Sequence, residues 1–592
     1  MRRTQAEIGG ARGVASPATL AGLAGCLLVL LAHVRLYWFL TDDAFISFRY
    51  ARNFADGFGL VFNPGFERVE GYTNFLWVVI LAALQRCTGW APHLTANWLS
   101  ATAGVGVWLL VVVCCWRRNA GSPQWLVLFP ALWLAMNRSV AVWSTGGLET
   151  MLFELLIVAA ALQAIRDLER RSPSWYRLAV LLALATLTRP DGALIAAAVF
   201  GARGLAAWWE QTLDWRRAAA GLAIFALLIG AHLAFRRVYY AEWLPNTYYA
   251  KLGGESWWDM GGIYFEAFLL EYAAWVWMPV VLVGVVSAAW TGRGAAAWVV
   301  TAVVVPHAFY VAYCGGDHFE YRPIAVYFPL LAILLADGLA AIASRWRRPV
   351  TAVVWGLACC ASIAVIPVLT HWDFPTIYQP GFPGLDARAN GSRGLVRLDW
   401  HPIVARVPGL RWYVGGYNRD IQTLSAHYVA LRQEEHRMFL ATVEPEGHRL
   451  RQLVADGLLP RDTYIGIPCV GAIPYFSNLR TFDVHGLTDK HVARQEMEPK
   501  ESRMMAHAKI ASYEYMEQCH VDLIALDVHL LVKDPAELAD SRDYARQMGT
   551  LVPVYVSSQP VVDGYFLLAV IRKPPATVQA RFPAVQLQPA WE

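Results

Sequence analysis

Charged residues are scarce in this chain. Asp, Glu, Lys and Arg make up 16% of the 592 residues, whereas hydrophobic residues make up 56%. Soluble proteins carry roughly a quarter charged residues, so this composition excludes an ordinary soluble protein and makes a membrane the expected solvent. The net charge of +4 is small for this length, and the basic residues are mostly scattered as pairs in loops. That pattern argues against a nucleic-acid partner.

Metal and nucleotide motifs are also missing. The nine cysteines contain no CxxC pair and no Cys/His cluster of zinc spacing, and no glycine-rich loop has Rossmann or P-loop spacing. Cys469 and Cys519 fall in a soluble region, where they can form one disulfide if that region is outside the cytoplasm. Four other cysteines lie inside apolar runs and are interpreted as buried packing residues: Cys114, Cys115, Cys359 and Cys360.

Apolar segments of membrane-spanning length dominate what is present. A bilayer core of about 30 Å needs roughly 20 residues of helix. The first run, 17–40, follows three arginines as a signal peptide would, but its length predicts a retained helix. Ten further spans are predicted at 94–116, 125–136, 150–165, 178–188, 192–202, 218–235, 268–290, 295–313, 323–341 and 351–369. We therefore expect a mostly α-helical bundle of about eleven spans.

Arginines cluster at one end of these segments. If the amino terminus is inside, every inner loop is basic, as the positive-inside rule requires. The residues concerned are Arg117, Arg118, Arg166, Arg170, Arg171, Arg177, Arg203, Arg216, Arg217, Arg293, Arg345, Arg347 and Arg348. An odd number of spans then places the tail after about residue 371 outside. The short run 72–84 would reverse this sidedness if it crossed, so it is predicted to lie along the outer interface.

The turn Thr188-Arg189-Pro190-Asp191-Gly192 is expected inside the membrane. About eleven apolar residues separate Arg177 from Arg189, and at 1.5 Å per residue they rise roughly 17 Å, about half of the hydrocarbon core. Charges at that depth either line a polar cavity or pair with one another. Both interpretations of Arg189 and Asp191 stay open.

The first outer loop begins with two adjacent carboxylates, Asp42 and Asp43. Such a pair can deprotonate a hydroxyl or hold a divalent cation, because one carboxylate can act while the other stays ionised. The alternative is a solvated helix end. The pair opens an amphipathic segment with Phe45, Phe48, Arg49, Arg52 and Phe54 in helical register, which predicts a helix at the interface.

Other outer loops supply candidate substrate-binding residues and cations. The polar candidates are Glu70, Asn74, Glu149, Glu242, Asn246, Tyr248, Asp317 and His318. The cations expected to bind a lipid phosphate are Arg189, Arg236, Arg237, Lys251 and Arg322, since arginine forks suit phosphate oxygens. Anchoring to anionic head groups is the alternative for the cations, and an interfacial aromatic belt for the tyrosines. His318 is a candidate to orient a substrate or bind a metal, and a divalent cation is an open option.

The region after residue 370 is expected to be a soluble extracytoplasmic α/β domain, 371–592, following a membrane domain, 1–370. Short apolar runs at 463–467, 521–526 and 565–571 predict strands, and 418–440 and 445–454 predict helices. The stretch 379–396 is rich in Pro and Gly and is predicted to be a linker. Its position suggests that the domain receives an acceptor or caps the site.

Several motifs resemble a known family. They are TDDAFISFRYARNFADGFGLVFNPGFERVEGYTNFLW, GGLET, LTRPDG, YYAEWLPNTYYAK, GGDHFEYRP and CVGAIPYFSNLRTFDVHGLTDKHVAR. In this order they resemble bacterial GT-C glycosyltransferases similar to the terminal arabinofuranosyltransferase of mycobacterial arabinan. The resemblance implies a helix bundle in the bacterial cytoplasmic membrane that takes a sugar from a polyprenyl phosphate and attaches it to a glycan, lipid or protein outside.

The resemblance also implies roles for residues. The acidic pair of the family falls on Asp42 and Asp43, one of which would be the base that activates the acceptor hydroxyl. The sequence departs from the family pattern at Phe66, which separates Gly65 from Glu67. No residue distinguishes arabinose from another sugar.

Two other classes are kept as alternatives. Some members of this sequence group carry a label of flagellar motor control, which would make the chain a non-catalytic regulator. A transporter of a lipid-linked substrate would also place charge within the membrane, although the sequence has no evident internal repeat and gathers its polar residues on one side. Fold follows from the pattern, but function must rest on the site.

Overall fold

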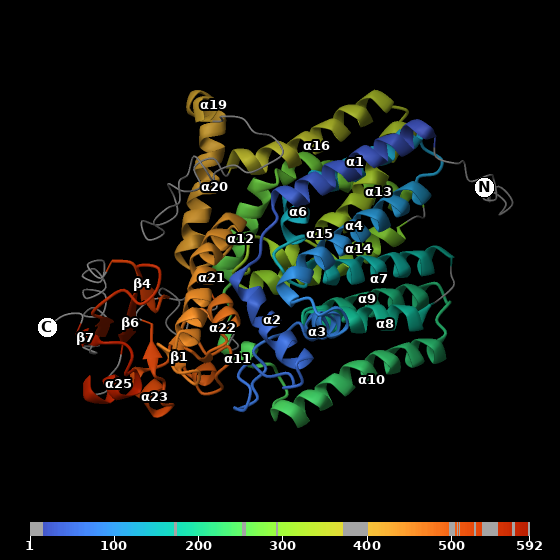
Figure 1. Cartoon of the computed structure of the whole chain (residues 1–592). Coiled ribbons are helices and arrows are strands. Elements are labelled where there is room, and N and C mark those ends of the chain that lie inside the picture. The colour runs from blue at the N-terminus through green and yellow to red at the C-terminus, as the bar shows by residue number, and fades with distance from the viewer. Residues whose placement is uncertain are drawn as a thin grey trace. The chain divides into compact units, whose positions relative to one another are not determined.

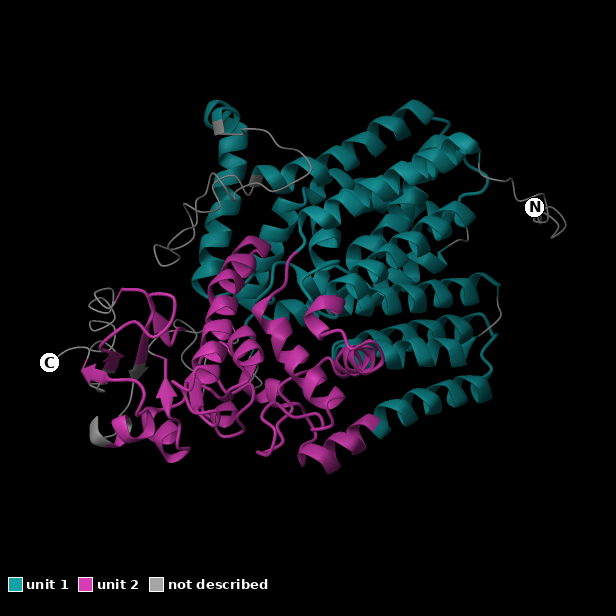
Figure 2. Cartoon of the chain, in the orientation of Figure 1, with its two compact units in different colours: residues 1–38, 97–231, 256–430 teal, residues 39–96, 232–255, 431–592 magenta. Residues whose placement is uncertain are grey.

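The chain separates into two compact units that are interleaved along the sequence (Figure 2). The computed structural model describes residues 16–170, 174–251, 256–291, 294–370, 401–496, 504–505, 507, 509–525, 528–534, 554–570 and 575–589. Unit 1 comprises residues 1–38, 97–231 and 256–430, and unit 2 comprises residues 39–96, 232–255 and 431–592. Each unit therefore draws on both of the predicted domains, whose division at residue 370 stays a prediction.

Unit 1 is helical, with α7, α8 and α9 lying side by side (Figure 1). Helix α4 begins in unit 2 and ends in unit 1, and helix α10 begins in unit 1 and ends in unit 2. The helices are α1 (Pro17–Leu36), α4 (Pro92–Arg118), η2 (Gln124–Val127), α5 (Leu128–Ala135), α6 (Arg138–Trp143), α7 (Thr150–Arg170), α8 (Trp175–Thr188), α9 (Gly192–Trp209), α10 (Trp215–Tyr240), α12 (Trp258–Glu271), α13 (Ala274–Trp290), α14 (Ala295–Cys314), η3 (Arg322–Ile324), α15 (Tyr327–Ala340), η4 (Ala341–Arg345), α16 (Pro349–Thr370), α19 (His401–Arg406) and α20 (Pro408–Ala426).

Seven helices in the described residues are long and apolar enough to cross a membrane, or eight if the bent pair α12 and α13 forms one span. A mostly helical, multi-pass membrane protein is therefore confirmed. The remaining predicted segments are also helical, but some are short: the helix at Gln124–Ala135 and α8 each fall below spanning length. At 1.5 Å per residue, the 14 residues of α8 rise only about 21 Å.

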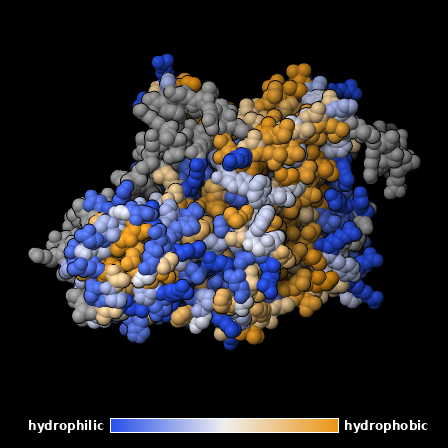
Figure 3. All heavy atoms as spheres, in the orientation of Figure 1, coloured by the Kyte–Doolittle hydropathy of each residue, from blue (hydrophilic) through white to orange (hydrophobic). Residues whose placement is uncertain are grey.

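Burial separates core helices from peripheral ones. The apolar window in residues 322–345 is 89% buried, whereas the window in α10 is 6% buried. Side chains such as Leu227 on α10 are therefore left to contact lipid, while α15 fills the centre of unit 1. Hydrophobic side chains gather over α1 and α16 on the visible face, and the surface over the strands is mostly hydrophilic (Figure 3).

The predicted single helix at 268–290 is wrong. The chain breaks between α12 and α13, whose axes differ by 89°. Ala273 adopts a left-handed backbone conformation with φ of 45°, and the indole N–H of Trp277 donates to the carbonyl oxygen of Tyr272 at 2.8 Å. Apart from Glu271, the residues on both sides of this turn are apolar or aromatic, so the hydrophobic pattern alone does not reveal it.

The arginine-rich helix ends meet within unit 1. The guanidinium of Arg118, at the end of α4, contacts Glu169 near the end of α7 and lies 2.7 Å from Asp337 near the end of α15. The ends of α4, α7 and α15 therefore lie close together, as expected if the basic loops that follow these helices are on the same side of the membrane. Arg171 and Arg293 lie outside the described residues.

Unit 2 contains helices and a sheet of seven strands in the described residues. The order β2-β1-β3-β6-β5-β7 starts with three parallel strands and continues antiparallel, and β4 pairs with β6. The predicted strands correspond to β1, β3 and β6, although residues 526 and 571 lie outside the described residues. The elements are α2 (Asp42–Ala55), α3 (Phe75–Thr88), α11 (Asn246–Lys251), α21 (Gln433–Ala455), β1 (Tyr464–Ile467), α22 (Ala472–Ser477), β2 (Arg480–Asp483), η5 (Val492–Arg494), α23 (Tyr513–Gln518), β3 (Leu523–Ile524), β4 (Leu531–Val532), β5 (Val554–Ser557), β6 (Phe566–Val570), α25 (Pro575–Arg581) and β7 (Leu587–Pro589).

The predicted helix at 418–440 is interrupted, whereas the predicted helix at 445–454 is confirmed as the second half of the longer helix α21. The chain breaks after Ala426, where Tyr428 and Ala430 have positive φ, and α21 then runs from Gln433 through Pro445. Proline removes one helical hydrogen bond, but the buried apolar face of α21 on both sides of it keeps the helix continuous. The predicted linker 379–396 lies outside the described residues.

We expect Gly338→Ala to destabilise unit 1. A Cβ at Gly338 would lie 2.1 Å from the carbonyl oxygen of Val280, where α15 crosses α13. The helices would have to separate, at a cost of about 1–3 kcal/mol or more. The apparent unfolding temperature in detergent measures this change. Gly230→Ala is the matched control, because nothing lies within 4 Å of its added Cβ; equal behaviour of the two variants would contradict the packing.

Candidate active site

The two adjacent carboxylates start helix α2. Thr41 caps the helix, its hydroxyl accepting the N–H of Ala44 at 3.3 Å. Asp42 is 7% exposed, and its Oδ1 accepts the backbone N–H of Ala472 at 2.7 Å. A Cβ at Gly471 would lie 2.1 Å from the Asp42 carbonyl oxygen, so this close approach requires glycine. The predicted amphipathic helix is present, with Phe45 and Phe48 buried.

Burial raises the pKa of the Asp42 carboxyl to about 7. The hydrogen bond from Ala472 lowers this pKa, and the negative charge of Asp43 raises it. Asp43 is only half-buried. The Asp42 carboxyl can therefore exchange a proton near neutral pH, and its environment differs from that of Asp43, as in carboxyl pairs that serve acid–base chemistry.

Glu70 forms a buried ion pair with Arg236 of α10. The Arg236 Nε and Nη2 donate to the two carboxylate oxygens at 2.5 and 3.1 Å. Burial raises the pKa of Glu70, and the Arg236 guanidinium opposes that shift. Asn74 is also buried and accepts the Ser47 hydroxyl at 3.1 Å. A phosphate would have to share Arg236 with this carboxylate.

The segment 239–251, which the sequence predicts to be an outer loop, contains the short helix α11. The side-chain amide of Asn246 donates to the backbone carbonyls of Gly486, Leu487 and Asp489 at 2.8–3.1 Å. Glu242 pairs with Arg494 at 2.6 Å. Three further candidates lie in this region: Arg237, Tyr248 and Lys251. The exposed guanidinium of Arg237 donates to the carbonyl oxygen of Ala241, and the ring of Tyr248 is exposed.

The turn between α8 and α9 holds a cluster of charges. Arg189 lies 2.9 Å from Asp191 and 3.5 Å from Glu149, which precedes α7. The Nε2–H of His307 donates to Asp191 Oδ2 at 3.1 Å, and His307 lies seven residues before the end of α14. At 1.5 Å per residue this position is roughly 10 Å along the helix from its end, so the turn is set within the bundle. The TRPDG motif indicated Arg189 and Asp191, whereas no local motif marks His307, which lies far along the sequence.

The segment between α14 and α15 contains an ion pair between two of its own residues. Arg322 Nε lies 2.9 Å from Asp317, and its guanidinium stacks on Phe319. His318 Nδ1 lies 2.9 Å from the carbonyl oxygen of Tyr428, whose ring stacks on the imidazole. Arg138 pairs with buried Glu320 at 3.1 Å.

The predicted site residues thus form two groups. Unit 2 contains Asp42, Asp43, Glu70, Asn74, Arg236, Arg237, Glu242, Asn246, Tyr248 and Lys251, and unit 1 contains Glu149, Arg189, Asp317, His318 and Arg322. Their roles in binding stay predictions. Among the described residues, no group of three or more His, Cys, Asp and Glu side chains is placed to hold a metal ion. Cys469 and Cys519 are not joined by a disulfide.

Asp483 is not among the site residues predicted from the sequence. Its carboxylate accepts the backbone N–H groups of His485, Gly486 and Thr488 at 2.8–3.0 Å, closing the turn after β2. Burial raises its pKa to about 6, against these hydrogen bonds. The segment Asp483–Gly486, with an aspartate three residues before a glycine of positive φ, is the local signal for such a turn.

We expect Asp42→Asn to flatten the pH dependence of stability. The folded-state pKa of about 7 lies above the ordinary value of 3.8. The folded state therefore binds more protons in this interval, and the contribution of Asp42 to stability is lost as pH rises towards 7. The difference in apparent unfolding temperature between wild type and variant, measured from pH 4 to 8, should move in favour of the variant. A difference that is constant with pH would contradict the burial of the charge.

The Glu70–Arg236 pair supports a double-mutant cycle. Either Glu70→Gln or Arg236→Gln alone leaves a buried charge without its partner, which should lower the free energy of unfolding by about 3–5 kcal/mol. The double variant removes both charges and should unfold at a higher temperature than the less stable single variant. Additive effects of the two substitutions would show that the side chains are not coupled.

Comparison with known proteins gives weak but consistent matches along the sequence. A family model described as a domain of unknown function, DUF8728, matches residues 437–568. The terminal β-(1→2)-arabinofuranosyltransferase of Corynebacterium glutamicum is 26% identical over an alignment that covers 52% of this chain. The enzyme of the same name from Mycobacterium tuberculosis is 28% identical over an alignment that covers 41% of this chain. These alignments cover 50% and 39% of the relatives, so the chain spans half or less of the length of the curated proteins it matches.

The fold has counterparts among solved structures. The crystal structure of ArnT from Cupriavidus metallidurans in the apo state has a TM-score of 0.56 at 12% identity, covering 95% of this chain and 99% of ArnT. ArnT bound to undecaprenyl phosphate has a TM-score of 0.50 at 15% identity, covering 79% and 86%. The chain therefore has the GT-C glycosyltransferase fold and is similar in sequence to terminal β-(1→2)-arabinofuranosyltransferases.

Proposed function

We propose that this protein is a membrane glycosyltransferase that moves a sugar from a polyprenyl-phosphate donor to a glycan, lipid or protein acceptor. The reaction would take place at the outer face of the bacterial cytoplasmic membrane. The observation that carries the proposal is the carboxylate pair at the start of α2, in which Asp42 is buried with a pKa near 7 and Asp43 is half-buried. The GT-C fold and the arabinofuranosyltransferase relatives support the same reaction class.

The two carboxylates would have different roles. Asp42 is buried and one of its oxygens already accepts a backbone N–H, so we assign it to positioning and to the electrostatics of the pair. Asp43 has the more accessible side chain and is assigned as the base. In the transfer, Asp43 takes the acceptor hydroxyl proton as that oxygen bonds to the anomeric carbon. The bond from this carbon to the phosphate oxygen breaks, and polyprenyl phosphate leaves.

The departing phosphate gains negative charge, which cations stabilise. The proposed cations are Arg236, Arg237 and Lys251 in unit 2 and Arg189 and Arg322 in unit 1. Arg236, Arg189 and Arg322 already lie beside carboxylates, so their charges are partly compensated before a ligand arrives. Arg237 is exposed and forms no ion pair among the described residues, which makes it the first of this set to test.

Arabinofuranose is the sugar that the relatives' names favour for the donor. Undecaprenyl phosphate is bound by ArnT, a protein of the same fold, and this supports the proposal of a polyprenyl phosphate carrier. The substrate-binding candidates Glu149, Asp317 and His318 in unit 1, and Glu70, Asn74, Glu242, Asn246 and Tyr248 in unit 2, are proposed to contact the two saccharides or to order the loops that do.

Transfer of label from polyprenyl-phosphate sugars by purified protein in lipid tests this function. We expect wild type to label an acceptor and Asp43→Asn to lose at least about 100-fold in rate, as removal of a general base does. Asp42→Asn should be impaired and should shift the pH–rate profile. Arg237→Gln should weaken the reaction with a smaller effect. The unfolding temperatures of the variants provide the folding control.

A panel of donors with and without EDTA identifies the sugar and the metal requirement. Full activity of Asp43→Asn would overturn the assignment of the base. Absence of transfer from every donor by folded wild type would favour a non-catalytic membrane protein, such as one linked to flagellar motor control, or a transporter of a lipid-linked substrate.

A further inference from the structure

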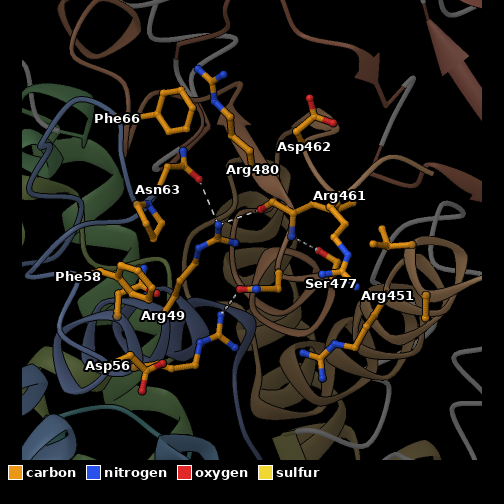
Figure 4. Close-up of a pocket in the computed structure, with 17 residues that line it drawn as sticks. Arg49, Asp56, Phe58, Asn63, Phe66, Arg451, Arg461, Asp462, Ser477 and Arg480 are labelled. Atoms are coloured by element: carbon orange, nitrogen blue, oxygen red, sulfur yellow. Dashed lines mark hydrogen bonds between the residues drawn. The ribbon is translucent and has the colours of Figure 1, made fainter. Parts of the chain in front are cut away.

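Unit 2 contains a cavity of about 950 Å³ that the proposed reaction does not use (Figure 4). Its walls come from α2, from the loop that follows α2, from the end of α21, from the loop between α21 and β1, and from the segment that joins α22 to β2. Neither Asp42 nor Asp43 lines it. Pockets of about 300–1,000 Å³ are typical of small-ligand sites, so this volume is large enough for several sugar rings.

The cavity has an excess of positive charge. Five arginines line it: Arg49, Arg52, Arg451, Arg461 and Arg480. The two carboxylates in the lining are Asp56 and Asp462, and Asp462 already pairs with Arg581 at 3.2 Å. Among the residues that the structure describes, none of the five arginines forms an ion pair. Five cations and two carboxylates leave the lining with a net positive charge, which an anionic ligand would neutralise.

The guanidinium group of Arg480 is held in a position suited to binding an anion. Its guanidinium carbon lies 3.4 Å from the ring centre of Phe66 and 3.7 Å from that of Tyr464, so two aromatic rings hold the planar group. Its buried Nε has no hydrogen-bond partner among the described atoms. A guanidinium held by stacking loses less conformational freedom when it binds a phosphate or carboxylate. Phe66 is the residue at which the sequence departs from its family pattern.

Arg49 and Arg52 form a fixed basic wall. Arg49 is 2% exposed and donates to the carbonyls of Phe62, Pro474 and Leu479 at 2.6–2.9 Å. Arg52 donates to the carbonyl of Tyr475 at 2.8 Å. Carbonyl partners hold these cations in place without cancelling their charge. Arg451 and Arg461 are exposed at the cavity and remain available for direct contact with a ligand.

The remaining lining suits a carbohydrate. Phe58 and Phe66 are 60% and 47% exposed, which leaves two apolar ring faces beside the cations. Asn63 and Asn478 add amide groups. Sugar rings present apolar faces for stacking and hydroxyl groups for such amides, whereas the arginines select for a charged substituent.

We propose that this cavity binds an anionic saccharide, a sugar chain that carries phosphate or carboxylate groups. The anionic group lies between Arg451, Arg461 and Arg480, and the neighbouring rings stack on Phe58 and Phe66. If the chain is the acceptor of the transfer, the cavity holds it away from the reacting hydroxyl. That last role rests on the proposed function, whereas the binding itself does not.

Calorimetric titration of the full-length protein in lipid nanodiscs tests the site. The probes are mannopentaose phosphate, neutral mannopentaose and tetragalacturonate. We expect the phosphate-bearing probe to bind about tenfold or more tightly than its neutral counterpart, with an affinity that falls as salt rises. Tetragalacturonate should compete with it.

Two variants and a control localise the binding. Arg451→Gln with Arg461→Gln removes two exposed charges and should weaken binding of mannopentaose phosphate by about tenfold. Arg480→Gln, which retains a planar side chain, should weaken it similarly. Arg411→Gln with Arg419→Gln on α20 is the matched control, because both arginines are exposed and lie in unit 1.

The outcomes separate the alternatives. Equal binding by wild type and the cavity variants, or equal affinity for mannopentaose and its phosphate, overturns the proposal. Displacement of the probe by undecaprenyl phosphate in the nanodisc would assign the cavity to a lipid phosphate and would also overturn it. Binding is repeated with Asp43→Asn, so failure of transfer and failure of saccharide binding are distinguished.

Discussion

Buried polar groups that bind backbone atoms hold together the three segments of unit 2. The carboxylate of Asp42 accepts an N–H from Ala472, and the amide of Asn246 donates to three carbonyls after β2. Arg49 similarly binds the carbonyls on either side of Asn478. A buried polar group without a partner costs about 1–3 kcal/mol or more, so segments far apart in sequence must fold together to satisfy these groups.

This constraint explains why the carboxylates at the start of α2 differ. The segment at Gly471 packs against Asp42 closely enough to exclude a side chain, and this contact removes the carboxyl from water. Asp43, on the next position of the helix, stays partly accessible. One tertiary contact therefore sets both the elevated pKa of Asp42 and the accessibility of its neighbour.

Charge compensation separates two kinds of arginine in this protein. Arg118, Arg138, Arg189 and Arg236 each lie against one or two carboxylates, as expected where charges leave water. In the unit 2 cavity, Arg49, Arg52 and Arg480 have carbonyl or aromatic neighbours instead. Their charge is left for something outside the chain, and this difference is what distinguishes a structural cation from a candidate ligand-binding one.

Local pattern was sufficient for the helices but not for their breaks. Each predicted span is helical because apolar length is a local property. The bend at Ala273 and the break before α21 depend on single backbone conformations with positive φ, which the surrounding packing imposes. The strands β1, β3 and β6 were recognisable as short apolar runs, whereas their order in the sheet joins distant residues.

The sequence by itself determined the membrane class, the helical segments and the carboxylate pair at Asp42 and Asp43, because composition, hydrophobic length and motifs are properties of neighbouring residues. The tertiary structure alone decided which charges are paired. It placed His307 beside Asp191, joined Glu70 to Arg236 and stacked Phe66 on Arg480. Those contacts depend on burial and on the meeting of distant segments, neither of which is encoded in any local stretch of the chain.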